Sequence, residues 1–376
     1  MSRLCKMAKH PVFVTRKFPP SVGGMETLAA GVWRSLQTVR PDAIKISHGG
    51  SNRALTWWVP TGLIRLAWRC VRGEAEYVLC GDALMNALCA PVLKIFRVPR
   101  AAMIMGLDVT YDNPLYRRLV HPPLRRTARV IAISAATANM AREAGVVQDR
   151  IAVLRLGVEL PRPGLPDRSA AAAAIRSRLG LADDDLVLLT LGRLVQRKGV
   201  RWFTESVLPH LDDRVHYLIA GQGPEEQRIR AAAKSGRVAN RVHVLGRVTD
   251  DIREELMTGA DIFLAPNIPV AGDMEGFGLV NVEAAMRGTL VVAADLEGIK
   301  DAVVPGRTGI LLPSGDVTTW VSELTSLLGD RDKLTATGDR FAADARELYS
   351  LQAMGRALSA SLGLGYAESS ARPEGY

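Results

Sequence analysis

The feature that most constrains the fold of this chain is an alternation of two kinds of segment along most of its length. Largely apolar, β-branched runs of five or six residues occur at 11–15, 43–47, 76–80, 101–105, 130–134 and 151–156. Intervening segments, such as 25–36 and 135–144, carry apolar residues at helical spacing. Continuous apolar runs of this length are typical of strands buried in a parallel sheet. The first half is therefore predicted to be a doubly wound α/β domain.

A second domain of the same kind is predicted after a segment without periodicity. The stretch "PRPGLPDRS" (161–169) contains three prolines and a glycine, which is typical of a linker. Ser169 is expected to cap the alanine-rich helix that follows. Apolar runs then resume at 186–192, 215–221, 242–246, 261–266, 290–294 and 309–313. With 376 residues, of which 48% are hydrophobic, the chain is long enough for two cores.

These patterns predict four parts of the chain. Residues 1–160 form an N-terminal Rossmann-like domain, and residues 161–348 form a C-terminal one. Residues 349–362 are apolar at helical spacing and are expected to form a last helix that returns to the N-terminal domain. Residues 363–376 lack a core-facing pattern and are expected to be a frayed tail.

Cysteine usage and hydropathy indicate the cellular compartment in which the protein is expected. Cys5, Cys70, Cys80 and Cys89 form no CxxC pair, which argues against a disulfide framework and against a zinc site. No apolar leader follows the basic N-terminus, and no run of about 18 apolar residues is present. We expect a cytoplasmic protein, with the inner face of the cell membrane as the alternative location.

Charge is divided unevenly between the two halves. Residues 1–165 carry 24 Lys and Arg against 10 Asp and Glu, a net charge of +14, whereas residues 166–376 carry 24 against 29, a net charge of −5. A basic half suggests a polyanionic partner, either an anionic membrane or nucleic acid. A bacterial composition rich in arginine explains the same imbalance equally well. No zinc finger, RNP motif or basic helix with interleaved aromatics is present, so nucleic acid is not expected as a partner.

Several predicted strands end in glycine-containing turns, where exposed backbone N–H groups and a helix N-terminus attract phosphate oxygens. In the first, Gly23 and Gly24 precede a helix expected from Met25, without the spacing of a nicotinamide site. A plain connecting loop is the alternative. In the second, "LGRLVQRKG", Arg193 and Lys198 lie five residues apart and are suited to one diphosphate; solvated loop charge is the alternative. Turns around 273–279 and at Gly298 complete the set, which indicates a nucleotide.

The third turn contains two glutamates in "EGFGLVNVE". If 278–287 is a helix ended by Gly288, Glu275 lies in the preceding loop and Glu283 lies within the helix. Eight residues of helix span ~12 Å. The two carboxylates of a retaining glycosidase lie about 5 Å apart, and those of an inverting glycosidase lie less than about 10 Å apart. A glycosidase pair is therefore disfavoured. Two acids on either side of a helix N-terminus suit a ligand with a central diphosphate and hydroxyls at both ends, although each acid alone is also explained as an ordinary helix charge.

These segments, taken together, resemble the family 4 glycosyltransferases. The motifs "GRLVQRKG", "LIAGQGPEEQRIRAAA", "VHVLGRV", "ADIFLAPN", "EGFGLVNVEAAMRGTLVVA" and "EGIKDAVVPGRTGILLPSGD" follow in the family's order across 186–317. A weaker resemblance extends through "KFPPSVGGMETLAAGV" and 127–159, but not through 51–100. The resemblance implies the GT-B fold, in which two Rossmann-like domains face each other across a deep cleft, and a retaining transfer from a nucleotide-sugar.

The resemblance also implies roles for particular residues. Arg193 and Lys198 would neutralise the donor diphosphate, Glu275 would bind the hydroxyls of the transferred sugar, and Glu283 would bind the ribose. Backbone N–H groups of Phe277, Gly278 and Leu279 would contact sugar and phosphate oxygens. Gly23 and Gly24 would approach the diphosphate from the N-terminal, acceptor-side domain. A UDP-sugar is the favoured donor, with a GDP- or dTDP-sugar as alternatives, and no other cofactor is implied.

One departure from the family concerns the N-terminal domain. Family members often have His-Gly where this chain has Met105 and Gly106 in "MIMGLDVTY", so what replaces the histidine is open. Asp108 nearby is a candidate for acceptor contact or local orientation, with a turn cap as the alternative. No DxD turn follows a strand, so we expect the leaving group to be stabilised by basic residues and no metal to be required. The mechanism depends on positioning and electrostatics, with the leaving diphosphate accepting the proton of the incoming hydroxyl.

The acceptor is indicated by residues 54–72, "ALTWWVPTGLIRLAWRCVR". A helix here places Arg65, Arg69 and Arg72 on one face and Ile64, Trp68 and Val71 on the adjacent one. Tryptophan with arginine is typical of a membrane interface, whereas the ordinary alternative has the tryptophans packed on the core. We predict a lipid-linked or membrane-proximal acceptor; a small-molecule acceptor of the antibiotic type is the alternative. Sugar, base, linkage and oligomeric state do not follow from the sequence.

Overall fold

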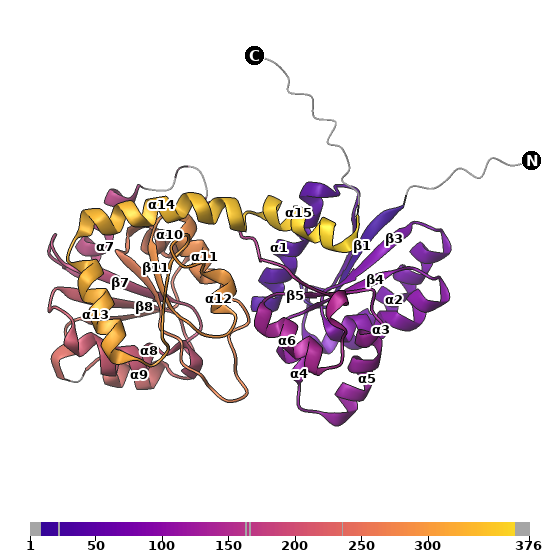
Figure 1. Cartoon of the computed structure of the whole chain (residues 1–376), viewed down its shortest axis with the longest axis horizontal. Helices are drawn as coiled ribbons and strands as arrows, with labels where there is room; N and C mark the ends of the chain where they lie inside the picture. The colour runs from indigo at the N-terminus through magenta and orange to yellow at the C-terminus, as the bar shows by residue number, and fades with distance from the viewer. Residues whose placement is uncertain (1–8, 22, 162–163, 165–166, 235, 365–376) are drawn as a thin grey trace, which may run out of the picture. The chain divides into compact units, whose positions relative to one another are not determined.

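The computed structural model describes residues 9–21, 23–161, 164, 167–234 and 236–364. These residues belong to two compact units (Figure 1). Unit 1 contains the chain up to Gly157 and again from Leu351, and unit 2 contains Val158–Ser350. Part of the predicted linker and residues 365–376 of the predicted tail lie outside the described residues.

Unit 1 is built on a six-stranded parallel sheet with the order β2-β1-β3-β4-β5-β6. Its strands are β1 (His10–Thr15), β2 (Ile44–Ser47), β3 (Ala75–Cys80), β4 (Arg100–Ile104), β5 (Arg129–Ala132) and β6 (Ile151–Val153). Each apolar run predicted in this half is confirmed as a strand, although β5 and β6 end earlier than expected. The runs are continuous because the central strands are covered on both faces, so that Val12, Phe13 and Val78 are all fully buried.

Helices pack on both faces of this sheet (Figure 1). They are α1 (Gly24–Val39), α2 (Leu55–Val71), α3 (Ala83–Ile95), α4 (Leu107–Thr110), α5 (Pro114–Arg125), α6 (Ala135–Glu143) and α15 (Leu351–Leu362). The last helix among the described residues, α15, packs against α1. The approach is close at Gly355, where an added Cβ would lie 2.3 Å from the carbonyl oxygen of Ser35. α15 is therefore part of the structure of unit 1, not an appendage to unit 2.

Unit 2 repeats the same architecture with the strand order β12-β11-β10-β7-β8-β9, again entirely parallel. Its strands are β7 (Leu186–Leu191), β8 (Val215–Ala220), β9 (Val242–Gly246), β10 (Ile262–Ala265), β11 (Leu290–Ala294) and β12 (Ile310–Leu312). Its helices are α7 (Arg168–Leu179), α8 (Val200–Trp202), α9 (Glu226–Ala232), α10 (Asp250–Gly259), α11 (Leu279–Met286), α12 (Ile299–Ala302), α13 (Val317–Leu328) and α14 (Arg331–Tyr349). The strands predicted in this half are confirmed, and so is the prediction of two doubly wound α/β domains.

The helix cap predicted at Ser169 is wrong. α7 begins at Arg168, two residues before the start that a cap at Ser169 implies, and Oδ1 of Asp167 accepts a hydrogen bond from the backbone N–H of Ala170 at 2.7 Å. Serine and aspartate both serve as N-caps, and a carboxylate gains the additional attraction of the helix N-terminus. The two candidates lie two positions apart, so the local pattern did not distinguish them.

The strand orders locate a switch point in each sheet, at which successive connections leave in opposite directions. In unit 1 it lies between β1 and β3, and in unit 2 it lies between β7 and β10. All strands of a parallel sheet have their carboxyl ends at one edge, and ligands of doubly wound folds bind in the crevice at the switch point on that edge. The loops after β7 and β10 are therefore the first places to look for a site in unit 2.

Candidate active site

The loops after β7 and β10 bring two predicted site residues together. Lys198 ends a short 3₁₀ turn, Gln196–Lys198, and Glu275 lies in the loop between β10 and α11. The Nζ atom of Lys198 lies 2.6 Å from Oε2 of Glu275. The two loops touch at Gly199, where φ is 65° and an added Cβ would lie 1.8 Å from the carbonyl oxygen of Pro266. Only glycine fits this approach, so the pairing of Lys198 with Glu275 depends on the glycine that follows Lys198.

The environment of Glu275 keeps its carboxylate ionised. Burial raises the pKa of Glu275, but the charge and the hydrogen bond of Lys198 outweigh burial, and the resulting pKa lies below its usual value. Asn267 contributes a further hydrogen bond, from Nδ2 to Oε2 of Glu275 at 3.3 Å. An ionised carboxylate accepts hydrogen bonds from several hydroxyl groups at once, which suits contact with a sugar.

Arg193 and Lys198 differ in how much of their charge is available. Arg193 lies two residues after the end of β7, is exposed, and its guanidinium has no hydrogen bond or ion pair within the described part of the chain. Lys198 is largely buried and already paired with Glu275. A ligand anion would therefore meet one unpaired cation, at Arg193, and one shared cation, at Lys198.

Two side chains at this site were missed by the sequence reasoning. Nη1 of Arg197 lies 3.3 Å from Asp273, and its Nε lies 3.8 Å from Glu275 without forming a hydrogen bond among the described residues. Asn267 is buried, and its Oδ1 also has no partner among these residues. Buried polar atoms are normally hydrogen-bonded, so unsatisfied atoms at this edge favour a polar ligand. An asparagine directly after "ADIFLAP" was a signal available in the sequence.

The N-terminus of α11 is open to an anion. Gly278 adopts the left-handed conformation at φ 84° immediately before the helix, and no side chain caps the helix. Phe277 is buried, with its ring against that of Tyr349 at a centroid distance of 6.3 Å. This packing anchors the turn, so that Phe277, Gly278 and Leu279 offer backbone N–H groups while the phenylalanine side chain belongs to the core.

Glu283 has different partners from Glu275. It lies within α11, as predicted, and its Oε2 is paired with Nη2 of Arg253 from α10. Arg287 bonds both the carbonyl oxygen of Glu283 and the carboxylate of Glu254. Burial raises the pKa of Glu283, and the nearby arginines offset part of this effect. The predicted placement of Glu275 outside the helix and of Glu283 inside it is confirmed, and the two carboxylates have no common ion-pair partner among the described residues.

The remaining predicted residues belong to unit 1. α1 begins at Gly24 without a side-chain cap, and an added Cβ at Gly23 would lie 2.3 Å from Oε2 of the buried Glu26. Glu26 in turn pairs with Lys17 at 3.5 Å. A carboxylate thus already lies beside the N-terminus of α1, next to the position where the resemblance implied donor contact by Gly23 and Gly24.

Asp108 is buried in α4, the short helix that follows β4, and its two oxygens accept hydrogen bonds from the backbone N–H groups of Met105 at 2.8 Å and Ala83 at 3.1 Å. Burial, together with the charge of Asp82, raises the pKa of Asp108 to about 6. Its carboxylate therefore joins the turn after β4 to the start of α3. These contacts favour local orientation over direct contact with an acceptor.

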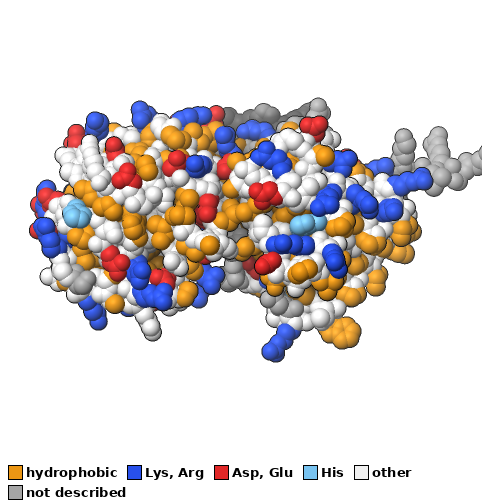
Figure 2. All heavy atoms as spheres, turned by 60° about the horizontal axis from the view of Figure 1, so that its bottom comes forward, with side chains coloured by type: hydrophobic (Ala, Val, Ile, Leu, Met, Phe, Trp, Pro, Cys, Tyr) orange, Lys and Arg blue, Asp and Glu red, His pale blue; other side chains and the backbone are white. Residues whose placement is uncertain are grey.

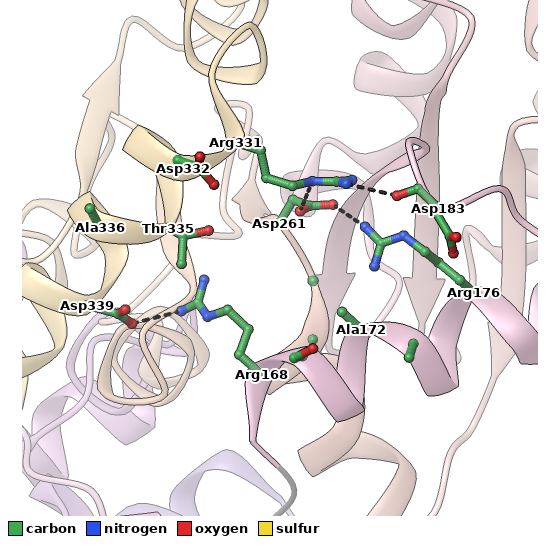
Figure 3. Close-up of a pocket in the computed structure, with 14 residues that line it drawn as sticks. Arg168, Ala172, Arg176, Asp183, Asp261, Arg331, Asp332, Thr335, Ala336 and Asp339 are labelled. Atoms are coloured by element: carbon green, nitrogen blue, oxygen red, sulfur yellow. Dashed lines mark hydrogen bonds and ion pairs between the residues drawn. The ribbon is translucent and has the colours of Figure 1, made fainter.

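A cavity of about 740 Å³ lies at the opposite, amino-terminal edge of the unit 2 sheet (Figure 3). Arg176 of α7 and Arg331 of α14 both pair with Asp261, at 3.3 and 3.2 Å, and Asp261 also accepts a hydrogen bond from the backbone of Val187. These ion pairs hold the two helices to the start of the sheet. None of the predicted site residues lines this cavity. Within the described residues, no group of three or more His, Cys, Asp or Glu is arranged to hold a metal ion.

Comparisons with known proteins identify what this chain resembles in sequence and in fold. Residues 185–330 match the family described as "Glycosyl transferases group 1". A D-inositol 3-phosphate glycosyltransferase from Nocardia farcinica is 34% identical over 225 residues, which cover 55% of this chain and 48% of that protein. This chain thus aligns with about half the length of that relative. A GDP-mannose-dependent alpha-(1-6)-phosphatidylinositol monomannoside mannosyltransferase from Mycobacterium tuberculosis is 28% identical over 354 residues, 87% of this chain and 91% of that protein.

Among solved structures, Anabaena Alr3699/HepE in complex with UDP matches with a TM-score of 0.75 and 19% identity over 94% of this chain and 99% of that one. Two doubly wound parallel units and this similarity define a protein of the GT-B fold class. Residues 185–330 carry the sequence pattern of the group 1 glycosyltransferases, which confirms the predicted family resemblance. The two relatives are named as a glycosyltransferase and a mannosyltransferase, in agreement with the predicted class.

Proposed function

We propose that this protein transfers a sugar, with retention of configuration, from a nucleotide diphosphate sugar to a hydroxyl group of a lipid-linked or membrane-proximal glycan intermediate. The observation that carries the proposal is the Lys198–Glu275 pair, 2.6 Å apart at the switch point of unit 2. The pair belongs to the same edge of the sheet as the uncapped start of α11. A cation, an ionised acid and a helix N-terminus are the groups that a diphosphate and a sugar require.

The roles follow from what each group has available. Arg193 and Lys198 neutralise the charge that develops on the leaving diphosphate, and the N–H groups of Phe277, Gly278 and Leu279 contact the sugar and phosphate oxygens. Glu275 accepts hydrogen bonds from the sugar hydroxyls. Glu283, held by Arg253, accepts those of the ribose. On ligand binding, Lys198 exchanges part of its attraction to Glu275 for the phosphate, which keeps a cation between the two anions.

The transfer step needs no protein nucleophile. The bond between the anomeric carbon and the diphosphate oxygen breaks, and the acceptor oxygen forms its bond on the same face. The proton of the acceptor hydroxyl passes to the departing diphosphate oxygen. Positioning and charge stabilisation by Arg193 and Lys198 then supply the rate enhancement. In unit 1, Gly23 and Gly24 are proposed to meet the diphosphate, and Asp108 to orient the turn after β4.

The donor is proposed to be a UDP-sugar, with a GDP- or dTDP-sugar as the alternatives. The similar structure of Alr3699/HepE is a complex with UDP, and the Mycobacterium tuberculosis relative is named as a GDP-mannose-dependent enzyme. Both support a nucleotide diphosphate donor and leave the base open between them.

The acceptor side rests on the surface of α2. Trp57 is 82% exposed and Trp68 is 59% exposed, and Ile64 and Val71 are also exposed, whereas Trp58 packs against the core. In Figure 2, the visible face of unit 1 (right) shows mainly Lys and Arg among hydrophobic side chains. Apolar side chains beside basic ones suit an anionic lipid surface. No described helix is long and apolar enough to cross a membrane.

A donor screen tests the proposal directly. Thermal shift with UDP, GDP and dTDP is expected to raise the melting temperature with one nucleotide, and a labelled sugar of that nucleotide is then offered with lipid extracts and with soluble acceptors. NMR of the product is expected to show the donor's anomeric configuration. An inverted product, or release of an epimerised donor without transfer, would contradict the proposed chemistry. Transfer only to soluble acceptors would favour the small-molecule alternative, and binding of single-stranded DNA in a filter assay would favour a nucleic-acid function.

A further inference from the structure

The loop after β11 contains a strained residue with no role so far. Glu297 has φ 48°, in the left-handed region that non-glycine residues rarely occupy, and Arg97 in unit 1 is the other such residue recorded in the described part of the chain. A conformation of this kind is energetically unfavourable for a residue with a side chain, and it persists where surrounding contacts stabilise it. Gly298 follows directly but adopts an ordinary helical φ of −73°, so the glycine does not take up the strain.

Glu297 and the residue that follows it both form hydrogen bonds with the backbone of Glu275. Oε2 of Glu297 accepts a hydrogen bond from the backbone N–H of Glu275 at 2.5 Å. The backbone N–H of Gly298 donates to the carbonyl oxygen of Glu275 at 3.1 Å. Both backbone polar groups of Glu275 are therefore bound by two consecutive residues, 297 and 298. This arrangement fixes the peptide planes on both sides of Glu275.

The approach of the two loops leaves no room for adjustment. An added Cβ at Gly298 would lie 2.1 Å from the carbonyl oxygen of Gly276 and 2.8 Å from that of Glu275. The loop that carries Glu297 is itself tied to the sheet and to α12, because the backbone N–H of Asp295 donates to Leu312 at 2.7 Å and that of Ile299 donates to Leu296 at 3.1 Å. The loop after β11 is thus held by the sheet, and Glu297 in this loop holds the backbone of Glu275.

We infer that Glu297 is a positioning residue, which holds the Glu275 backbone so that the Glu275 carboxylate meets Lys198 and the sugar of the donor. The inference rests on the proposed function of Glu275. It explains why a carboxylate stands at a strained position: glycine would relieve φ but would leave the N–H of Glu275 without this acceptor. Arg197 then lies 3.3 Å from Asp273 and 3.8 Å from Glu275, and Lys198 pairs with Glu275.

Three variants test this inference: Glu297→Gly, Glu297→Gln and Arg97→Gly. Glu297→Gly removes both the strain and the acceptor, and is expected to lower kcat about 10-fold with little change in the affinity for free nucleotide, because only the sugar-facing carboxylate is displaced. Glu297→Gln keeps an amide oxygen as acceptor and is expected to stay within about 3-fold of wild type. Arg97→Gly relieves the same strain far from this loop in sequence and is expected to leave kcat unchanged.

Hydrogen exchange supplies a measurement that does not depend on turnover. The peptide containing Glu275 is expected to exchange about 10-fold faster in Glu297→Gly than in wild type or Arg97→Gly. Wild-type exchange and wild-type kcat in Glu297→Gly would overturn the inference. If exchange changes as expected but the wild-type protein transfers no sugar from any donor, the positioning contact stands and the proposed function fails.

Discussion

Each of the two sheets has an ion pair at its switch point, but the two pairs have different surroundings. In unit 1, Arg16 from the loop after β1 pairs with Asp82, which follows β3, at 2.9 Å. In unit 2, Lys198 from the loop after β7 pairs with Glu275, which follows β10, at 2.6 Å. Asp82 is completely buried and also caps α3 by accepting from the backbone N–H of Met85 at 2.9 Å.

The difference lies in what surrounds each carboxylate. The carboxylate of Asp82 is occupied by Arg16 and by a helix cap, so its hydrogen-bonding capacity serves the fold. Glu275 lies beside polar atoms of Arg197 and Asn267 that have no hydrogen-bond partner among the described residues, and its own contacts with Lys198, Arg197 and Asn267 all involve one oxygen, Oε2. The same crevice of a doubly wound sheet is thus closed by structural bonds in unit 1 and left with unmet polar atoms in unit 2.

The largest effect is expected from removing the unit 2 pair. The double substitution Lys198→Met, Glu275→Gln removes both charges together and is expected to lower kcat/KM at least about 1,000-fold, roughly 4 kcal/mol of barrier, because transition-state charge stabilisation is lost. Steady-state kinetics measures the effect, and calorimetry is expected to show a small change in melting temperature. Near-normal kinetics would refute the assignment of this site.

Removing the unit 1 acid is expected to act on stability. Asp82→Ala leaves Arg16 unpaired and α3 uncapped, and is expected to lower the free energy of unfolding by about 3 to 4 kcal/mol. Denaturant titration measures this loss. Glu275→Gln is the comparison, with an expected loss of about 1 kcal/mol, because the amide oxygen of glutamine still accepts from Asn267 and from the amine of Lys198. A larger loss for Glu275→Gln than for Asp82→Ala would reverse the contrast between the two pairs.

The pH dependence of stability is expected to have opposite signs at Asp108 in unit 1 and at Glu275 in unit 2. The pKa of Asp108 is raised to about 6, so the folded protein favours the protonated carboxyl. The contribution of this proton to the free energy of unfolding is fully present below about pH 4 and is lost as pH rises through 6, a change of about 3 kcal/mol. The lowered pKa of Glu275 means that its contribution is present above the usual value and is lost as pH falls. Unfolding free energies of wild type and Asp108→Asn between pH 4 and 8 measure this. If Asp108→Asn keeps the wild-type slope between pH 4 and 6, another group titrates there.

The smallest effect on the fold is expected on the surface of α2. Trp57→Ser with Trp68→Ser is expected to change the free energy of unfolding by less than about 0.5 kcal/mol, because both rings are largely exposed. Co-sedimentation with anionic vesicles at low salt is expected to fall sharply in this variant. Trp58→Ser, which removes a ring packed on the core, is the control that should lower stability. Failure of the wild-type protein to sediment with these vesicles would disprove the membrane proposal.

Much of the fold follows from local patterns. The apolar runs predict the strands of both sheets because a strand covered on both faces has apolar side chains at successive positions. The helix around Glu283 was also predictable, since Gly278 and Gly288 mark its ends in the sequence. The cap of α7 was not, because Asp167 and Ser169 compete within the same turn and differ by little in energy.

The sequence by itself determined the two α/β units, the glycine turns, and the placement of Glu275 in a loop with Glu283 in a helix, because each depends on residues within one turn or strand. Only the tertiary structure decided which charges meet. Lys198 and Glu275 are brought together by adjacent strands, Arg16 reaches Asp82 across 66 positions, and Glu297 binds the backbone of Glu275 across 22. A side chain's partner in a parallel sheet is set by strand order, and strand order depends on packing between elements distant in sequence.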